Sequence, residues 1–223
     1  MCPADETERR LPGVASARNL LGSRAAALDA LLVRRRDEWQ ALIVGAEDEA
    51  LIARTEDAVR LAYARLALRH GHLGGDFHAY HNEGHILEIC AGRIDRLVDA
   101  NGLRTFSLRD VCALTLFGAG HDLRQREAQQ LVAGVGANER ASIDETRRIL
   151  EVCGFSIQHD ADIFAALELM IAGSTFDARP PPGGHLYNAA DLVQSGGALA
   201  AKLDQILDAR RPDWHADAEI VHA

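Results

Sequence analysis

The stretch Val111-Cys-Ala-Leu-Thr-Leu-Phe-Gly-Ala-Gly-His121-Asp122 is an apolar segment that ends in an imidazole followed directly by a carboxylate. Burial of its apolar side chains would fix the segment in the core and present the polar end to whatever lies above it. Adjacent residues on a regular helix point about 100° apart, so His121 and Asp122 can converge on one point only where a helix ends or is distorted. A shared metal ion is the simplest target for this pair.

A second polar cluster, Tyr80-His-Asn-Glu-Gly-His85, lies upstream of that segment. His81 and His85 are spaced i and i+4, so they would share one face of a helix that begins at Tyr80 or His81. The helix would run to a stop signal at Asn101-Gly102. Two histidine-bearing elements would then bracket one site.

Length and composition favour a single all-α domain. The chain has 223 residues with 48% hydrophobic but only 5% aromatic content, which favours helices over a β-sandwich. We expect a frayed or loosely docked N-terminal arm at 1–23, one helical domain at 24–210 and a poorly defined tail at 211–223. Hydrophobic periodicity predicts helices at about 24–44, 55–69 with Thr55 as N-cap, 80–101, 107–122 opened by a capping box at Ser107 and Asp110, 138–154, 160–172 and 188–207.

Charge and cysteine usage restrict the partners and the compartment. The formal net charge of −9 opposes non-specific binding to nucleic acid, although a small anionic substrate remains open if a metal supplies positive charge. No segment has the apolar length of a membrane span, and the N-terminus shows no signal-peptide pattern, so we expect a cytoplasmic protein. The cysteines form no CxxC pair, which favours free thiols over zinc ligands or disulfides; they are Cys2, Cys90, Cys112 and Cys153.

Together, His85, His121-Asp122 and Asp191 reproduce the spaced H…HD…D pattern, and the chain resembles the HD-domain superfamily of metal-dependent phosphohydrolases. The YHNxxH wording at 80–85 looks like two branches of that superfamily, small bacterial HD proteins and the cyclic-nucleotide phosphodiesterases. The bacterial branch also shows Asn-Glu-x-x-Ser after the HD pair, matched here by Asn138, Glu139 and Ser142, and a final Asp-Leu, matched at 191–192. The resemblance covers roughly 80–197 and implies an HD-domain helical bundle.

The resemblance implies that His85, His121, Asp122 and Asp191 are metal ligands. Imidazole and carboxylate together suit Mn, Fe, Ni, Zn or Mg, with one or two ions per chain. Many relatives carry a Thr-x-x-His element before the final aspartate, but Thr175 is followed by Phe-Asp-Ala, which argues against a second ion.

Catalytic and substrate contacts follow from the same resemblance. Asp122 would be both a metal ligand and a catalytic residue, and could bridge a second ion if there is one. His81 would either protonate the leaving oxygen or only orient a neighbour by a hydrogen bond. Glu139 would orient a ligand or the attacking water, or simply cap its helix. Arg124, Arg140 and Thr175 are the candidate substrate contacts, with solvated side chains as the alternative for both arginines. The histidines that match no family position are predicted to lie on the surface; they are His70, His72, His78, His159, His185, His215 and His222.

The predicted function is metal-dependent hydrolysis of a phosphomonoester or phosphodiester, with a nucleotide as the favoured substrate. Two alternatives stay open. The first is a di-iron oxygenase on the same fold, and the second is a regulatory module that binds a nucleotide without hydrolysing it. A homodimer is the default expectation for the oligomeric state.

Overall fold

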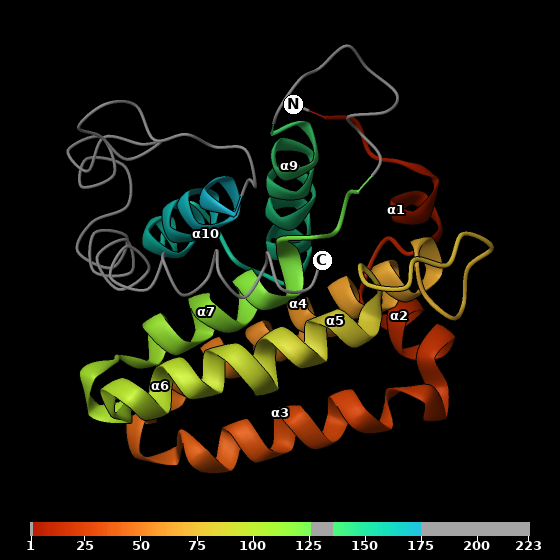
Figure 1. The fold of residues 1–223 in the computed structure, drawn as a ribbon. Helices are drawn as coiled ribbons and strands as arrows, with labels where there is room; N and C mark the ends of the chain where they lie inside the picture. The colour runs from red at the N-terminus through yellow and green to blue at the C-terminus, as the bar shows by residue number, and fades with distance from the viewer. Residues whose placement is uncertain (1, 126–135, 175–223) are drawn as a thin grey trace.

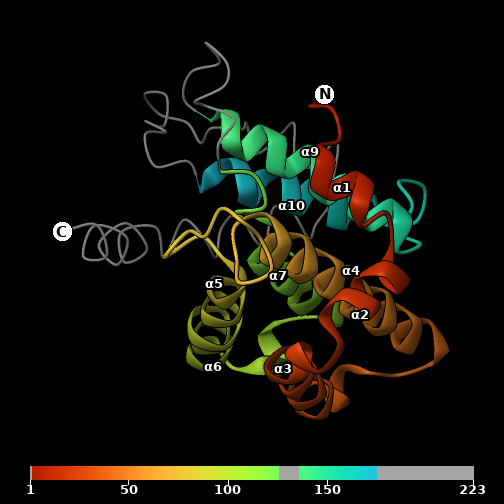
Figure 2. The same cartoon turned by 90° about the vertical axis from the view of Figure 1, so that its right-hand side faces the viewer.

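All regular structure in the described part of the chain, residues 2–125 and 136–174 of this computed structural model, is helical (Figures 1 and 2). The helices are α1 (Glu6–Arg10), α2 (Val14–Leu21), α3 (Ala26–Glu38), α4 (Ala46–Arg69), α5 (Glu83–Glu88), α6 (Asp95–Asn101), α7 (Leu108–Gly120), α9 (Ala137–Val152) and α10 (Ala161–Gly173), with a π-helical turn at Ile89–Ile94 between α5 and α6. The all-α prediction is therefore confirmed. The helix predicted at 188–207 and the tail at 211–223 lie outside the described residues.

Helix α7 forms the centre of the fold. Every residue of α7 except Arg109 is buried, and it packs against α4, α9, α10 and the π-helical turn. In Figure 1, α5 and α6 form one continuous rod in front of α4, α3 lies below them, and α9 and α10 lie on the opposite side of α7. The stretch that begins at Val111 is thus the core helix that its apolar sequence predicts.

Two glycines allow neighbouring elements to approach the end of α7. A Cβ at Gly118 would lie 2.8 Å from Cys90 Sγ and 3.0 Å from Ile94 Cδ1, both in the π-helical turn. A Cβ at Gly120 would lie 2.6 Å from Thr146 Oγ1 on α9. Because neither glycine has a side chain, the last turn of α7 can lie directly against the π-helical turn on one side and α9 on the other.

Two predicted helix starts are wrong, and local hydrogen bonds or burial explain both. Helix α4 begins at Ala46 after an extended Gly45, and Thr55 is buried within the helix and is not its N-cap. Helix α5 begins at Glu83, since Asn82 Oδ1 accepts a 2.8 Å hydrogen bond from the Gly84 amide and caps the helix there. His81 therefore precedes the helix. The capping box at Ser107 is confirmed.

The N-terminal segment, expected to be frayed or loosely docked, is ordered helix packed on the core. Leu11, Ala17 and Leu21 are buried, and α2 packs against α4. The Glu8 carboxylate is 3% exposed and forms ion pairs with arginines from α4 and α9. The docking of this segment depends on a few apolar contacts and one buried acid. Its sequence therefore shows no long apolar repeat from which the docking could be predicted.

None of the four cysteines forms a disulfide. Cys90 and Cys112 are buried free thiols, and burial raises the pKa of each to about 11. Cys2 and Cys153 are partly buried and form no disulfide. Among the described helices, none combines the length and the apolar character needed to cross a bilayer.

Candidate metal centre

His85, His121 and Asp122 meet at one point, although they come from two separate helices. Nε2 of His85 lies 3.1 Å from Asp122 Oδ2, and Nε2 of His121 lies 3.0 Å from the same oxygen. One donor atom from each residue lies within 4.8 Å of the other two. The predicted convergence of the upstream histidine with the His-Asp pair is present in the structure.

The position of the pair at the end of α7 explains how two adjacent residues can converge. His121 is the C-cap of α7, with its amide bonded to the Phe117 carbonyl, and Asp122 follows in a turn. The turn changes the direction of the chain, so Asp122 can face the ring of its neighbour. His85 reaches the same point from the first turn of α5.

The turn that carries the pair is fixed by three hydrogen bonds to its backbone. Thr146 Oγ1 donates to the Gly120 carbonyl at 3.3 Å, and Arg69 donates to the Leu123 carbonyl at 2.6 Å. The Ser142 hydroxyl accepts from the Arg124 amide at 3.0 Å. The serine of the Asn-Glu-x-x-Ser element thus has a positioning role, which is to hold the chain just beyond the aspartate.

Asp122 and the neighbouring histidines shift one another's pKa values. Burial opposes ionisation of Asp122, but His121 and His85 outweigh it and hold the pKa of the carboxyl well below its ordinary value. Burial likewise opposes protonation of His121, but the Asp122 carboxylate raises the pKa of the ring. Asp122 is therefore an anion at neutral pH, as a metal ligand must be.

His81 lies at the edge of the same cluster. Its Nε2 is 3.8 Å from Asp122 Oδ2, its ring centroid is 5.9 Å from that of His85, and its side chain is 30% exposed. Burial lowers the pKa of His81 and outweighs the opposite effect of Asp122. The ring therefore stands between the buried donors and solvent.

Glu139 lies in the first turn of α9, close enough for Asp122 and His121 to act on its charge. Burial raises the pKa of its carboxyl, and the negative charge of Asp122 adds to the increase. A carboxylate with a raised pKa is a better proton acceptor than an ordinary one.

Of the predicted substrate contacts, Arg124 is buried and Arg140 is exposed. Arg124 is 5% exposed, and its guanidinium pairs with Glu8 at 3.1 Å and approaches Glu145 at 3.7 Å. These acids occupy the side chain in the interior, so the phosphate-clamp role predicted for it is wrong. Arg140 is exposed on α9. Thr175 and Asp191 lie outside the described residues.

The donor set suits a divalent ion. Two imidazole nitrogens and one carboxylate oxygen are ligands that Zn, Fe, Ni and Mn accept in proteins. Both rings direct Nε2 at Asp122, while Nδ1 of His85 lies 3.7 Å from the Glu88 carboxylate and Nδ1 of His121 is buried without a hydrogen-bond partner in the described residues. A further donor, such as the one predicted from Asp191, would complete a four-coordinate site.

The structure also shows a group that the sequence did not reveal. His70 and His78 were predicted to be surface residues, but His70 is 3% exposed and both rings approach Asp76. The arrangement depends on how the loop between α4 and α5 folds back, and no spacing rule marks it. This group of His70, Asp76 and His78 could hold a metal ion, as could the first centre, formed by His85, His121 and Asp122.

No protein-family model, curated protein or solved structure gives a significant match to this chain.

Proposed function

We propose that this chain is an HD-type metal-dependent phosphohydrolase that cleaves a phosphomonoester or phosphodiester, with a nucleotide as the favoured substrate. The observation that supports the proposal most directly is the approach of two imidazole nitrogens, from His85 and His121, to one oxygen of Asp122 at 3.1 and 3.0 Å. In our proposal Asp191 is the further ligand. A divalent ion in such a site supplies positive charge to phosphate oxygens and lowers the pKa of a water molecule.

The chain's own residues divide the proton transfers. Glu139 accepts a proton from the attacking water, for which its raised pKa suits it. The water oxygen forms a bond to phosphorus while the bond to the leaving oxygen breaks. His81 gives a proton to that leaving oxygen, since an anionic phosphate beside the ring would raise a pKa that burial has lowered.

Arg140 and Thr175 are the proposed substrate contacts. Arg140 is exposed in the first turn of α9, one residue after Glu139, so it remains a candidate phosphate contact. Thr175 stays a proposal on the basis of the sequence alone. Arg124 is not included, because buried acids already bind it.

The test is a phosphatase and phosphodiesterase screen of protein that has been stripped with a chelator and reloaded separately with Mn, Fe, Ni, Zn or Mg. Asp122→Ala should reduce turnover by at least about 100-fold, because the metal's charge contributes several kcal/mol to such a transition state. Asp122→Asn provides a nearly isosteric second variant. Asp99→Ala, at an exposed aspartate on α6, is the matched control and should keep full activity.

Equal activity of the Asp122 variants and wild type would exclude this centre as the catalytic site. Two redox-active irons per chain with oxygen consumption would favour the oxygenase alternative. Saturable nucleotide binding without turnover by any metal-loaded form would favour the regulatory module. Circular dichroism of each variant checks that a loss of activity does not reflect unfolding.

A further inference from the structure

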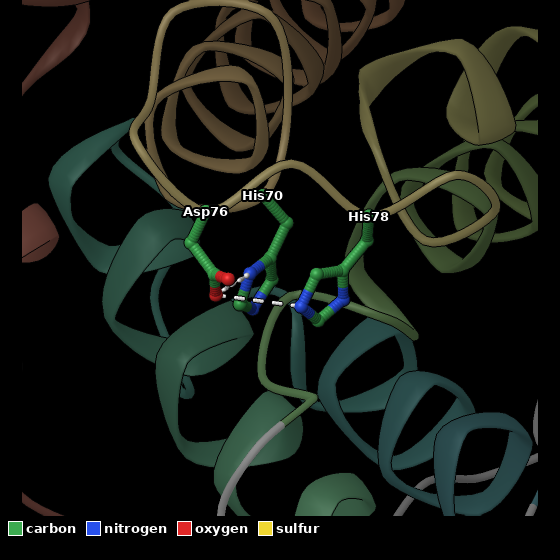
Figure 3. A group of neighbouring side chains, drawn as sticks. All are labelled: His70, Asp76 and His78. Atoms are coloured by element: carbon green, nitrogen blue, oxygen red, sulfur yellow. Dashed lines mark ion pairs between the residues drawn. The ribbon is translucent and has the colours of Figure 1, made fainter.

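Three side chains of the loop between α4 and α5 form a second cluster of metal-ligating groups (Figure 3). His70 Nδ1 and His78 Nε2 each lie 3.4 Å from Asp76 Oδ2. One donor atom from each residue lies within 4.8 Å of the other two. The His70 side chain is 4% exposed and that of Asp76 is 42% exposed, so the cluster extends from the interior to the surface and is open to an ion from solvent.

The backbone of the loop brings these residues together. The His78 amide donates a 2.8 Å hydrogen bond to the His70 carbonyl, which closes the loop between the two histidines. Immediately after His70 the chain passes against α4, where a Cβ at Gly71 would lie 2.7 Å from Ala67 Cα and overlap the Glu83 carboxylate. Glycine therefore permits a reversal that places two imidazoles side by side.

We propose that His70, Asp76 and His78 form a second binding site, for a divalent transition-metal ion of the zinc type. Donor atoms around a tetrahedral ion with bonds of about 2.1 Å are about 3.4 Å apart, which matches both distances to the Asp76 oxygen. Imidazole donors select such ions over Mg²⁺ and Ca²⁺, which prefer oxygen. The site shares no ligand with the His85 centre and does not depend on the proposed function.

Binding must change the relative orientation of the two rings. The His70 and His78 rings are stacked, with centroids 4.0 Å apart and planes inclined by 17°. The nitrogen lone pair of an imidazole lies in the plane of the ring, so two nearly parallel rings cannot both aim at one nearby ion. An ion at this site would tilt the rings out of the stack, which the NMR signals of both imidazoles would report.

Metal binding at this site would fix the loop that leads into helix α5. Asn82 Nδ2 donates to the His78 carbonyl at 2.7 Å, while Asn82 Oδ1 caps the helix by accepting from the Gly84 amide. An ion that fixes His78 therefore fixes the loop against the start of the helix that carries His85. His81 lies between His78 and Gly84, the two residues that Asn82 joins by hydrogen bonds. The second site would therefore act by positioning His81 and would not itself take part in the reaction.

The test measures binding of Co²⁺ alone to protein stripped of metal, by equilibrium dialysis with metal analysis and by visible absorption. The double variant His121→Ala/Asp122→Ala removes the first centre and should still bind about one equivalent per chain. Adding Asp76→Ala and His78→Ala should abolish that binding. Asp76→Asn, added to the His121→Ala/Asp122→Ala background, should weaken Co²⁺ affinity by at least about tenfold. Loss of a residue that only hydrogen-bonds to a metal ligand already costs about that much, and Asp76 is itself a ligand in this proposal.

His159→Ala, at an exposed histidine, is the control and should leave the binding unchanged. The proposal is overturned if His121→Ala/Asp122→Ala, folded by circular dichroism, binds no Co²⁺. It is equally overturned if Asp76→Ala/His78→Ala binds as much as wild type, which would leave a simple ion-pair cluster. If His121→Ala/Asp122→Ala binds as much as wild type while Asp76→Ala/His78→Ala loses all binding, the second site stands and the first centre fails.

Discussion

The Glu8 carboxylate lies 3.1 Å from Nη1 of Arg124, so the first helix of the chain contacts the residue two positions beyond Asp122. Arg65 of α4 and Arg148 of α9 approach the same carboxylate at 3.4 and 2.7 Å. Four elements distant in sequence are thereby joined by one buried acid. The N-terminal helix is part of the structure that supports the candidate centre.

We expect Glu8→Ala to lower the free energy of unfolding by about 3 kcal/mol, because buried Arg65 and Arg124 lose one of their two closest counter-charges and keep Glu145 at 3.4 and 3.7 Å. Urea unfolding followed by circular dichroism measures the change. Glu6→Ala, at an exposed acid on the same helix, should change stability by less than about 0.5 kcal/mol. Similar losses in the two variants would contradict a specific role for Glu8.

Ser142→Ala should lower the free energy of unfolding by about 1 to 2 kcal/mol. The variant leaves the Arg124 amide without the side-chain acceptor that it has 3.0 Å away in a buried position. Ser23→Ala, at an exposed serine, is the reference and should have almost no effect. Should the Ser142 variant prove as stable as the reference, the serine would not hold the turn after the His-Asp pair.

Gly118→Ala should destabilise the protein by about 1 to 3 kcal/mol, because the added methyl overlaps Cys90 Sγ and Ile94 Cδ1. Gly92→Ala tests the same change where the nearest atom, on Arg96, is 4.0 Å away, and should be neutral or stabilising by up to about 1 kcal/mol. Thermal unfolding of both variants gives the comparison. A Gly118 variant as stable as the Gly92 variant would show that the close approach to the π-helical turn is not needed.

Asp160 should contribute stability that disappears in acid. Burial opposes its ionisation, but the Ser156 amide and Arg54 outweigh this and lower the pKa of the carboxyl below its ordinary value of 3.8. A lowered pKa in the folded state means that the contribution is complete above pH 3.8 and is lost as the pH falls through the folded-state pKa.

Asp160→Asn should therefore be less stable than wild type at pH 7, and the difference should shrink as the pH falls below about 3.8. Urea unfolding at a series of pH values measures it, with Asp99→Asn as an exposed control. A difference that is constant across the series would mean that the charge of Asp160 does not contribute.

Local sequence rules predicted the features that depend on neighbouring residues. Ser107 opens α7 by the capping box that its spacing indicates, and Gly154 ends α9 with a φ of 86°. The meeting of His121 and Asp122 at a helix end followed from helix geometry alone. Such features need only a few residues of context.

Features that depend on long-range contacts could not be predicted in this way. Arg124 is buried because Glu8 pairs with it across 116 positions of sequence, and no pattern in either segment indicates the other. His70 is buried for a similar reason, since the loop that follows it folds back against α4. Tertiary pairing of charges and loops decided these positions, and local propensity did not.

The three hydrogen bonds that hold the backbone from Gly120 to Arg124 come from side chains of the fold itself, on α4 and α9. The conformational entropy of this turn is therefore lost when the chain folds, before any ion arrives. In this respect the protein should differ from a zinc finger, which unfolds when its ion is withdrawn. A chelated sample should keep its helical content and exchange one metal for another without refolding.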